Sequence, residues 1–426
     1  MRVLLVPFGS HGDVHPFLAL GQALRARGHG ITFILNEQFG PLVRSLGFEH
    51  VPLGHDERLA EVANHPDLWH PRKAFSVVAK AALEAMRLTF PLIVERYVPG
   101  ETVVVGGSIA LSTRVAHEVT GIPAATVHLQ PSAFFSEYET PTFPTLGAVT
   151  RWPRWFKRPF FDFIYRKGID PSIAPGLNAF RAEHGLPPGR DVMRIYLHSP
   201  QLVLGFFPSW FAMPQPDWPP HAKLVGFPLY DEREATPLPP ELDAFLQKAT
   251  PPIAFTPGSA NLHGREFFEA AAEACRLLGR RGILLTRFPA NIPPGLPDGV
   301  VHCLYAPFGT LLPRVAALVH HGGIGTSAQA MASATPQLVM PLAHDQFDNA
   351  ARMKNRGIAR ALPQSRFRGP AVAGMLHELI DDPAVKARCL ETASLFARDP
   401  HPMEAACEAV EALNRAVTSP SSRPRP

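Results

Sequence analysis

Short apolar runs alternate with helical patterns along the chain. Val3–Phe8 is a continuous apolar run, as expected of a strand that is buried on both faces. Apolar residues then recur at helical spacing from a predicted helix start at Pro16 to Gly28, and His29–Leu35 begins the next strand. Because a strand–helix–strand unit has a right-handed crossover, its two strands are predicted to be parallel.

The same alternation recurs in both halves of the sequence. It predicts strands at 101–106, 123–127, 252–256, 282–286, 316–320 and 337–340, with helices at 109–119, at 265–278 and after residue 320. The segment Gly226–Pro240 is rich in proline and charge, which is typical of a linker. We therefore expect an α/β protein with two Rossmann-like, doubly wound domains that face a cleft, because ligands of such sheets bind at the carboxyl ends of the strands.

The predicted organisation has five parts. They are an N-terminal Rossmann-like domain (1–228), a linker (229–250), a C-terminal Rossmann-like domain (251–395), a C-terminal helix that returns to the first domain (396–417) and a disordered tail (418–426).

Composition excludes several classes of protein. A length of 426 residues is too great for one core, and 41 basic against 37 acidic residues leave only +4, too even a balance for a nucleic-acid partner. No apolar stretch approaches the ~20 residues that span a bilayer. The cysteines form no CxxC pair and are predicted to be reduced thiols of a cytoplasmic protein, without a metal site; they are Cys275, Cys303, Cys389 and Cys407.

The segment His320–Gln329 carries the strongest chemical signal. Its glycines expose backbone N–H groups at the start of a helix, where the helix dipole favours an anion. A histidine before them can donate to a phosphate, and two hydroxyls add donors, although tight packing alone could also demand the glycines. The set suits a diphosphate held without a metal; its members are His321, Gly322, Gly323, Gly325, Thr326 and Ser327.

Two further segments accompany this loop, Tyr305–Pro313 and Pro341–Asn349. Together with Gly9–Asp13, they resemble the nucleotide-sugar signature of the inverting glycosyltransferases of the UDP-glycosyltransferase-like superfamily (family 1). Shorter segments such as His198–Gln201 and Gly226–Leu229 are most similar to the rhamnosyltransferase of bacterial rhamnolipid synthesis. The resemblance implies the GT-B fold and no cofactor apart from the co-substrate, a dTDP-sugar or UDP-sugar.

The resemblance also implies roles on the donor side. Tyr305 takes the place of a tryptophan that stacks on the pyrimidine, and a tyrosine ring can stack as well. His321 corresponds to the histidine that contacts the leaving-group phosphate. Asp345 and Gln346 correspond to the pair that hydrogen-bonds the hydroxyls of the donor sugar.

Three further donor-side residues follow from the same resemblance. Gln329 stands where many enzymes that use UDP-sugars carry a glutamate that binds the ribose hydroxyls. This difference leaves dTDP as an alternative to UDP for the nucleotide of the donor. Ser259 is expected to approach the phosphates. His344 either touches the donor or orients its own loop.

The proton acceptor is predicted in the first loop. Attack by a hydroxyl is helped by a positioned base. The plant enzymes carry that base, a histidine, three residues before the proline of this loop, and here the position is Asp13 because the proline is Pro16. His11 and His15 are the competitors. Capping of the following helix is the structural alternative for Asp13, and it is compatible with catalysis.

The segment Arg151–Phe161 alternates basic residues with large aromatic ones. Such a composition suits contact with a membrane interface, or a lid over an apolar acceptor pocket. Packing of the aromatic rings in a core, with solvated charges, is the plain alternative. The predicted acceptor contacts are His15, Phe134, Phe135, Trp152 and Trp155.

The resemblance implies inverting, metal-independent transfer of a hexose or deoxyhexose from dTDP-L-rhamnose or UDP-glucose to a hydroxyl of a lipid-like or other apolar acceptor. It also implies that residues 1–228 form the acceptor-binding domain and residues 251–395 the nucleotide-sugar-binding domain. Two other functions suit the same fold, a sugar-nucleotide 2-epimerase and a non-catalytic nucleotide-sugar-binding accessory subunit. We expect a cytoplasmic protein with peripheral contact at the inner face of the membrane.

Overall fold

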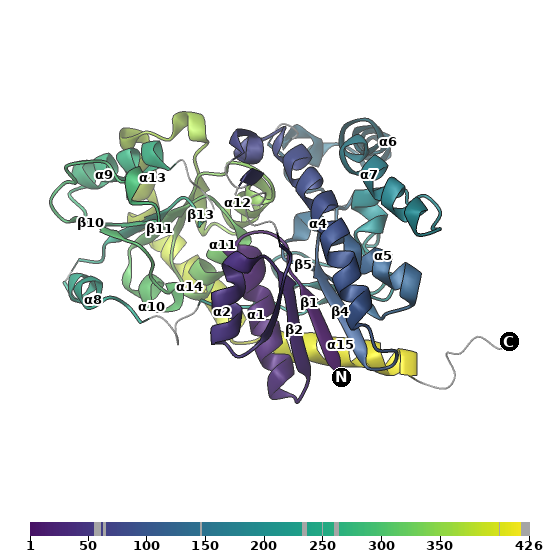
Figure 1. Cartoon of the computed structure of the whole chain (residues 1–426). Coiled ribbons are helices and arrows are strands. Elements are labelled where there is room, and N and C mark those ends of the chain that lie inside the picture. Colours follow the sequence, from purple (N-terminus) through teal and green to yellow (C-terminus); the bar gives the residue numbers. More distant parts are fainter. Residues whose placement is uncertain are drawn as a thin grey trace.

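The structure is a computed structural model that describes residues 1–54, 61–62, 65–144, 147–231, 237–248, 250–259, 264–399 and 401–418. Two α/β domains lie side by side, each with its own parallel sheet and helices on both faces (Figure 1). The predicted fold class is confirmed. The expected tail lies almost entirely outside the described residues.

The N-terminal sheet has the order β3-β2-β1-β4-β5-β6-β7, and all its pairings are parallel. The order reverses between β1 and β4, which creates the crevice where ligands of such sheets bind. The strands are β1 (Arg2–Val6), β2 (Gly30–Leu35), β3 (Glu49–Pro52), β4 (Thr102–Gly107), β5 (Ala124–His128), β6 (Leu202–Gly205) and β7 (Ala222–Leu224).

Alternate residues of β1 enter different cores. Val3 and Leu5 pack in the core that contains α1, whereas Leu4 and Val6 pack in the core that contains α4, α5 and α7. Burial on both faces explains why the strand is an uninterrupted apolar run. The helices of this domain are α1 (His11–Ala26), α2 (Gly40–Ser45), α4 (Ala74–Arg96), α5 (Leu111–Thr120), α6 (Arg154–Ile164) and α7 (Asp170–Glu183).

The predicted start of the first helix at Pro16 is wrong, because α1 begins at His11. Ser10 and Asp13 form a capping box, in which Ser10 accepts from the Gly12 N–H and Asp13 accepts from the Ser10 N–H. The predicted base therefore lies inside the first helical turn.

The C-terminal sheet has the order β10-β9-β8-β11-β12-β13 and is parallel throughout. Its strands are β8 (Ile253–Thr256), β9 (Gly282–Leu285), β10 (Val300–Cys303), β11 (Ala317–His320), β12 (Gln337–Val339) and β13 (Ala359–Ala361). The helices are α8 (Pro240–Leu246), α9 (Arg265–Leu278), α10 (Phe308–Leu311), α11 (Ile324–Ala332), α12 (Gln346–Asn355), α13 (Gly369–Asp381), α14 (Pro383–Phe396) and α15 (Pro402–Thr418).

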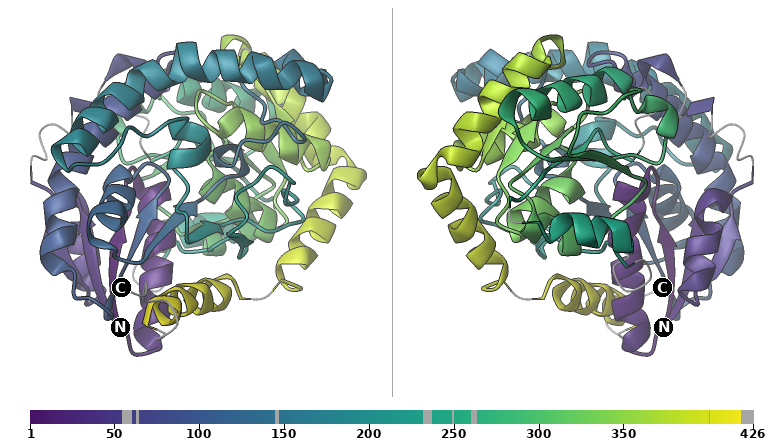
Figure 2. Two further views of the ribbon diagram at one scale, coloured as in Figure 1. Left: turned by 90° about the vertical axis from the view of Figure 1, so that its right-hand side faces the viewer. Right: turned by 90° about the vertical axis from the view of Figure 1, so that its left-hand side faces the viewer.

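The last helix, α15, lies against the N-terminal domain beside α1 (Figure 2). Its Glu411 accepts from Arg27 at 2.7 Å and bonds the ring of His29 at 2.9 Å. These two hydrogen bonds lower the pKa of Glu411 to about 2. Cys407 and Val410 on the same helix are fully buried.

Within the described ranges, the structure contains no helix that is both long and apolar enough to cross a membrane.

Candidate functional site between the two domains

Asp13 lies on the N-terminal side of the domain boundary. Its Oδ2 accepts from the Ser10 N–H at 2.7 Å and lies 3.1 Å from the Ser10 hydroxyl. Both of these contacts with Ser10 go to the same carboxylate oxygen. A side chain at Gly9 would overlap this carboxylate, and the φ of +131° at Gly9 also favours glycine. Burial raises the pKa of Asp13 above its ordinary value.

The two competing histidines lie on the same helix and contact different partners. The ring of His11 packs edge-on against Phe39 at 5.0 Å and against His15 at 5.6 Å. His15 in turn packs against Tyr230, which comes after the N-terminal sheet, at 5.3 Å. Both imidazoles are therefore within the same cluster of rings beside Asp13.

The predicted anion site lies on the C-terminal side, at the start of α11. Gly323 is the N-cap residue and has no side chain to cap the helix, and Gly325 in the first turn is exposed with open space around its Cα. Among the residues that the structure describes, no side chain caps the first-turn N–H groups of this helix. Gly322 has a φ of +94°, and a Cβ there would lie 2.8 Å from Val339.

His321 lies between two glycine backbones. A Cβ at Gly258 would lie 2.7 Å from its Cε1, and a Cβ at Gly323 would lie 2.6 Å from its Nε2. Burial lowers the pKa of His321 to about 4, so the ring is neutral at pH 7. Its Nδ1 is buried and has no hydrogen-bond partner among the described residues. Such an orphaned ring nitrogen is suited to a ligand oxygen.

The polar residues of α11 differ in their surroundings. Thr326 is half-buried at the first turn, whereas the Ser327 hydroxyl donates back to the Gly323 carbonyl at 2.9 Å. The buried Gln329 donates from Nε2 to the carbonyl of Tyr230 at 3.4 Å. Ser259 is exposed in the loop after β8.

The loop before α12 contributes a carboxylate. Burial, assisted by the charges of Asp13 and Asp348, raises the pKa of Asp345 to about 7, and its Oδ2 accepts from Asn349 at 2.6 Å. The carboxamide oxygen of Gln346 accepts from two backbone N–H groups of the same loop. His344 has a φ of +57°, and its ring packs edge-on against Trp69 of the N-terminal domain at 5.8 Å.

Tyr305 is tied to the segment that joins the domains. Its hydroxyl donates to the carbonyl of Asp231 at 2.7 Å, while the Asp231 carboxylate accepts from the Gly309 N–H at 2.6 Å. The guanidinium of Arg287 lies 5.1 Å from the centre of the Tyr305 ring. It also donates to the Nε2 of His11 at 3.0 Å, across the domain boundary.

The sequence interpretation missed Arg287. The available signal was a basic residue directly after the strand pattern at 282–286, at the carboxyl end where ligands of parallel sheets bind.

Several contacts hold the two halves of the site against each other. Helices α1 and α11 touch, and the charge of Asp13 acts on Asp345. The Thr142 N–H donates to Asp348 of α12 at 2.9 Å, and Arg352 of the same helix bridges Asp348 and Glu139. The predicted base and the predicted anion site thus belong to one region.

The predicted acceptor contacts are dispersed. Phe134 is fully buried and stacks on Trp218 at 4.5 Å, and Phe135 packs against Phe161 at 4.6 Å. Trp152 is half-buried, but Trp155 is 77% exposed on α6. Packing inside the N-terminal domain therefore accounts for the two phenylalanines.

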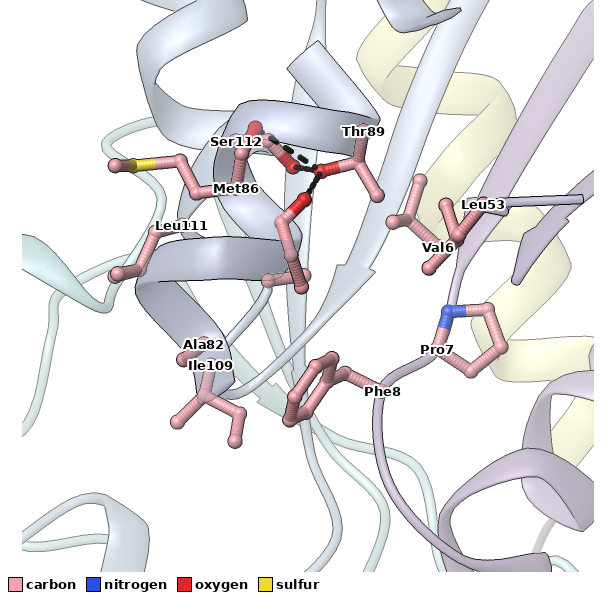
Figure 3. A pocket seen from close by; sticks show the side chains of 12 residues that line it. Val6, Pro7, Phe8, Leu53, Ala82, Met86, Thr89, Ile109, Leu111 and Ser112 are labelled. Atoms are coloured by element: carbon pink, nitrogen blue, oxygen red, sulfur yellow. Dashed lines mark hydrogen bonds between the residues drawn. The ribbon is translucent and has the colours of Figure 1, made fainter. Parts of the chain in front are cut away.

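A small cavity of about 10 Å³ lies in the N-terminal domain at the reversal of the sheet order (Figure 3). Phe8, at the end of the β1 loop that leads to Asp13, and Ile109 line it with other apolar side chains. The hydroxyls of Thr89 and Ser112 are hydrogen-bonded to each other at 2.6 Å in its wall. The cavity is therefore lined mainly by apolar side chains of the N-terminal domain.

No group of three or more His, Cys, Asp or Glu side chains among the described residues is arranged to hold a metal ion. The four cysteines are buried and unpaired with one another.

Both halves of the sequence match known families. Residues 3–138 match the glycosyltransferase family 28 N-terminal domain, and residues 287–413 match the erythromycin biosynthesis protein CIII-like C-terminal domain.

Similar proteins extend over the full length. The chain is 30% identical to O-mycaminosyltylonolide 6-deoxyallosyltransferase of Streptomyces fradiae, over 96% of this chain and 97% of that protein. The glycosyltransferase of kitacinnamycin has a similar structure, with a TM-score of 0.73, 21% identity and coverage of 97% and 98%. The glycosyltransferase VinC, solved in complex with dTDP, gives a TM-score of 0.68, 20% identity and coverage of 97% and 100%.

Proposed function

Because the protein belongs to the GT-B glycosyltransferases of the family 28 and erythromycin CIII-like type, we propose that it transfers a deoxyhexose or hexose from a pyrimidine nucleoside diphosphate to a hydroxyl of an apolar acceptor, with inversion. Nucleotide-sugar use and glycosyl transfer are properties of the family. The donor, the acceptor and the stereochemistry are the proposal. The epimerase and accessory-subunit alternatives are not favoured, because the relatives are transferases.

One observation supports this proposal above the others. The Nδ1 of His321 and the start of α11, neither of which has a side-chain partner within the described ranges, lie in the same region as the carboxylate of Asp13. The first two suit a diphosphate, and the third suits removal of a proton from an acceptor.

The reaction assigns one task to each group. Asp13 accepts the proton of the acceptor hydroxyl while that oxygen forms a bond to the anomeric carbon. The bond from this carbon to the phosphate oxygen breaks, and its electron pair leaves with the nucleoside diphosphate. The first-turn amides of α11 and His321 stabilise the departing negative charge. Attack opposite the leaving group inverts the anomeric centre.

Arg287 supplies positive charge at the same place. His321 is neutral at pH 7, so its hydrogen bond adds no net charge against the diphosphate. Arg287 joins the end of β9 to His11 and lies over Tyr305, the residue proposed to stack on the base. A guanidinium suits a phosphate through its fork of N–H donors.

A thymidine diphosphate sugar is the donor that we propose first. Gln329 offers an amide where a carboxylate would bind ribose hydroxyls, and thymidine diphosphate lacks the 2′-hydroxyl. VinC, a protein of the same fold, was solved with dTDP. Rhamnose is the sugar implied by the resemblance of the shorter motifs, with UDP-glucose as the other donor to be tested.

The acceptor is proposed to be apolar, with a lipid-like hydroxyalkanoyl compound as one case and a macrolide as the other. The match of residues 287–413 to the erythromycin biosynthesis protein CIII-like domain supports this class of acceptor. A lipid acceptor would be met at a bilayer, so peripheral contact with the inner face of the membrane belongs to the same proposal.

The test is acceptor-dependent release of nucleoside diphosphate. The protein is incubated with dTDP-L-rhamnose, dTDP-glucose or UDP-glucose, with and without a hydroxyalkanoyl acceptor or a macrolide aglycone. Release that requires an acceptor, together with a glycosylated product of inverted configuration, is the expected result. Release or isomerisation of the sugar without any acceptor would support an epimerase, and the absence of both reactions would contradict the proposal.

A further inference from the structure

Residues 151–168, which contain helix α6, concentrate positive charge. This segment has one acidic residue, Asp162, and six basic residues, a net charge of +5, whereas the whole chain carries only +4. The rest of the molecule is therefore close to neutral. The basic residues are Arg151, Arg154, Lys157, Arg158, Arg166 and Lys167.

The same helix exposes large aromatic rings. Trp155 is 77% exposed, Phe163 is 62% exposed and Phe156 is 45% exposed. At 100° per residue, these three positions fall within about one third of the helix circumference. Arg158 lies beside that arc and is 74% exposed, with its Nε 3.8 Å from Glu137, whereas Arg154 stacks on the ring of Tyr138 at 3.6 Å. Helix α6 therefore presents an aromatic stripe with a basic edge.

The opposite side of α6 is anchored in the protein. Phe161 is buried, and its ring packs against Phe135 at 4.6 Å. Lys157 donates from Nζ to the carbonyl of Thr150 at 2.9 Å. The position of the helix is thus fixed by its inner residues, and packing in the domain does not require Trp155 and Phe163.

We propose that α6 docks the protein on an anionic lipid surface. Trp and Phe side chains occupy the headgroup layer of a bilayer, and nearby Arg and Lys side chains are attracted to anionic lipid. A second copy of the protein is a poor occupant, because two surfaces that carry the same excess of exposed arginine side chains repel each other. The positive charge and the exposed aromatic rings together therefore favour an anionic lipid surface as the binding partner of α6.

The docking surface lies in the acceptor-binding domain and connects to the site. Phe135, which packs under α6, follows β5, and the same loop continues to Thr142, whose N–H donates to Asp348 of α12. Docking by α6 would bring the acceptor side of the molecule to the bilayer. The proposal deepens the proposed function and rests on its peripheral membrane contact, but lipid binding needs no donor, so binding to vesicles and glycosyl transfer can fail separately.

Vesicle co-sedimentation tests this surface, without nucleotide sugar. The full-length protein is mixed with vesicles of phosphatidylcholine alone or with phosphatidylglycerol added. Wild type is expected to bind the anionic vesicles and to lose most of that binding between about 0.1 M and 1 M salt. The double variant Trp155→Ser with Phe163→Ser is expected to bind about tenfold more weakly.

A matched control removes exposed apolar residues elsewhere. Leu277→Ser with Leu390→Ser alters side chains that are 46% and 57% exposed on α9 and α14, and should bind vesicles like wild type. Every variant must retain the thermal shift given by dTDP or UDP, which shows that it is folded. The proposal is wrong if wild type does not bind anionic vesicles. It is also wrong if the aromatic double variant binds them as tightly as wild type does. A change of molar mass in the aromatic variant, without vesicle binding by wild type, would assign α6 to self-association instead.

Discussion

Arg287 donates a hydrogen bond to the Nε2 of His11 at 3.0 Å, from the end of β9 in one domain to the first turn of α1 in the other. A guanidinium has no acceptor, so the Nε2 of His11 must accept this bond through its lone pair. The lone pair that would make His11 a base is already engaged. This contact favours Asp13 as the proton acceptor.

Arg287→Ala should weaken nucleotide binding. The guanidinium is proposed to supply the charge that a neutral His321 lacks, and a hydrogen bond to a charged group contributes about 1.5–3 kcal/mol, so affinity for dTDP or UDP should fall by roughly tenfold or more. Calorimetric titration at low and high salt measures this. Arg280→Ala, which removes an ion pair with Asp381 at 3.6 Å, is the control and should bind like wild type. Unchanged affinity and salt dependence in Arg287→Ala would remove Arg287 from the site.

Asp13→Asn should lower kcat by about 10²–10⁴, because the proton acceptor is lost. The asparagine oxygen can still accept from the Ser10 N–H, so the helix cap and the nucleotide thermal shift should persist. Ser10→Ala separates capping from catalysis: it should cost about 1 kcal/mol of stability while turnover is largely retained. Near wild-type turnover in Asp13→Asn would transfer the role to His15.

The acid limb of the rate profile should also report on Asp13. Burial raises the pKa of this carboxyl, and only the ionised form can accept a proton. The value of kcat/KM should therefore rise with pH and reach its plateau at a higher pH than an ordinary aspartate would give. A profile that is flat down to the ordinary pKa of aspartate would show that Asp13 does not govern the step.

Asp345→Asn should stabilise the protein at high pH and not at low pH. Burial raises the pKa of Asp345 from 3.8 to about 7, so between these values the folded state binds more protons than the unfolded state. The free energy of unfolding of wild type therefore falls as pH rises through this window. The destabilisation caused by the buried, ionised carboxylate is fully present above about pH 7. Asparagine has no charge to bury, so the gain in Tm over wild type should be larger at about pH 8 than at about pH 5.

Thermal unfolding at the two pH values measures this difference. The same variant should bind donor sugars more weakly, because Asp345 is proposed to contact their hydroxyls. An equal Tm difference at both pH values would show that Asp345 is ionised throughout the range.

Gly258→Ala should reduce nucleotide affinity. A Cβ at this position would lie 2.7 Å from the ring of His321, and the φ of +98° at Gly258 is strained for alanine. The imidazole would be displaced from its position between Gly258 and Gly323. Gly374→Ala on α13 is the matched control, because a Cβ there meets nothing within 4 Å. Its free energy of unfolding should rise by up to about 1 kcal/mol, since alanine favours a helix more than glycine does. A dTDP thermal shift of wild-type size in Gly258→Ala would contradict this account of His321.

Strands and the glycine loop could be predicted because their signals are local. Buried parallel strands are short apolar runs, and a helix start that binds an anion needs glycines at fixed positions, so β8, β9, β11 and α11 lie where the pattern indicates. The start of α1 was misplaced because Pro16 was given more weight than the Ser10–Asp13 capping box. Proline is tolerated early in a helix, but it does not have to begin one.

The pairing of residues across the domain boundary could not be predicted. Nothing local in the sequence relates Arg287 to His11, or Thr142 to Asp348, because these contacts depend on how two independently folded sheets dock. For the same reason, the sequence could not show that Phe134 and Phe135 are buried in the core whereas Trp155 is exposed. Aromatic residues with similar composition around them differ only in tertiary context.

The return of α15 to the N-terminal domain means that the C-terminal sheet is inserted between two parts of its neighbour. Two crossings, after β7 and between α14 and α15, connect the halves, and a double connection restricts their relative motion more than a single linker does. A fragment cut at the first crossing would leave the surface of α1 around Arg27 and His29 uncovered, without its Glu411 partner. A circular permutation that carries α15 with the N-terminal half would keep this contact in place.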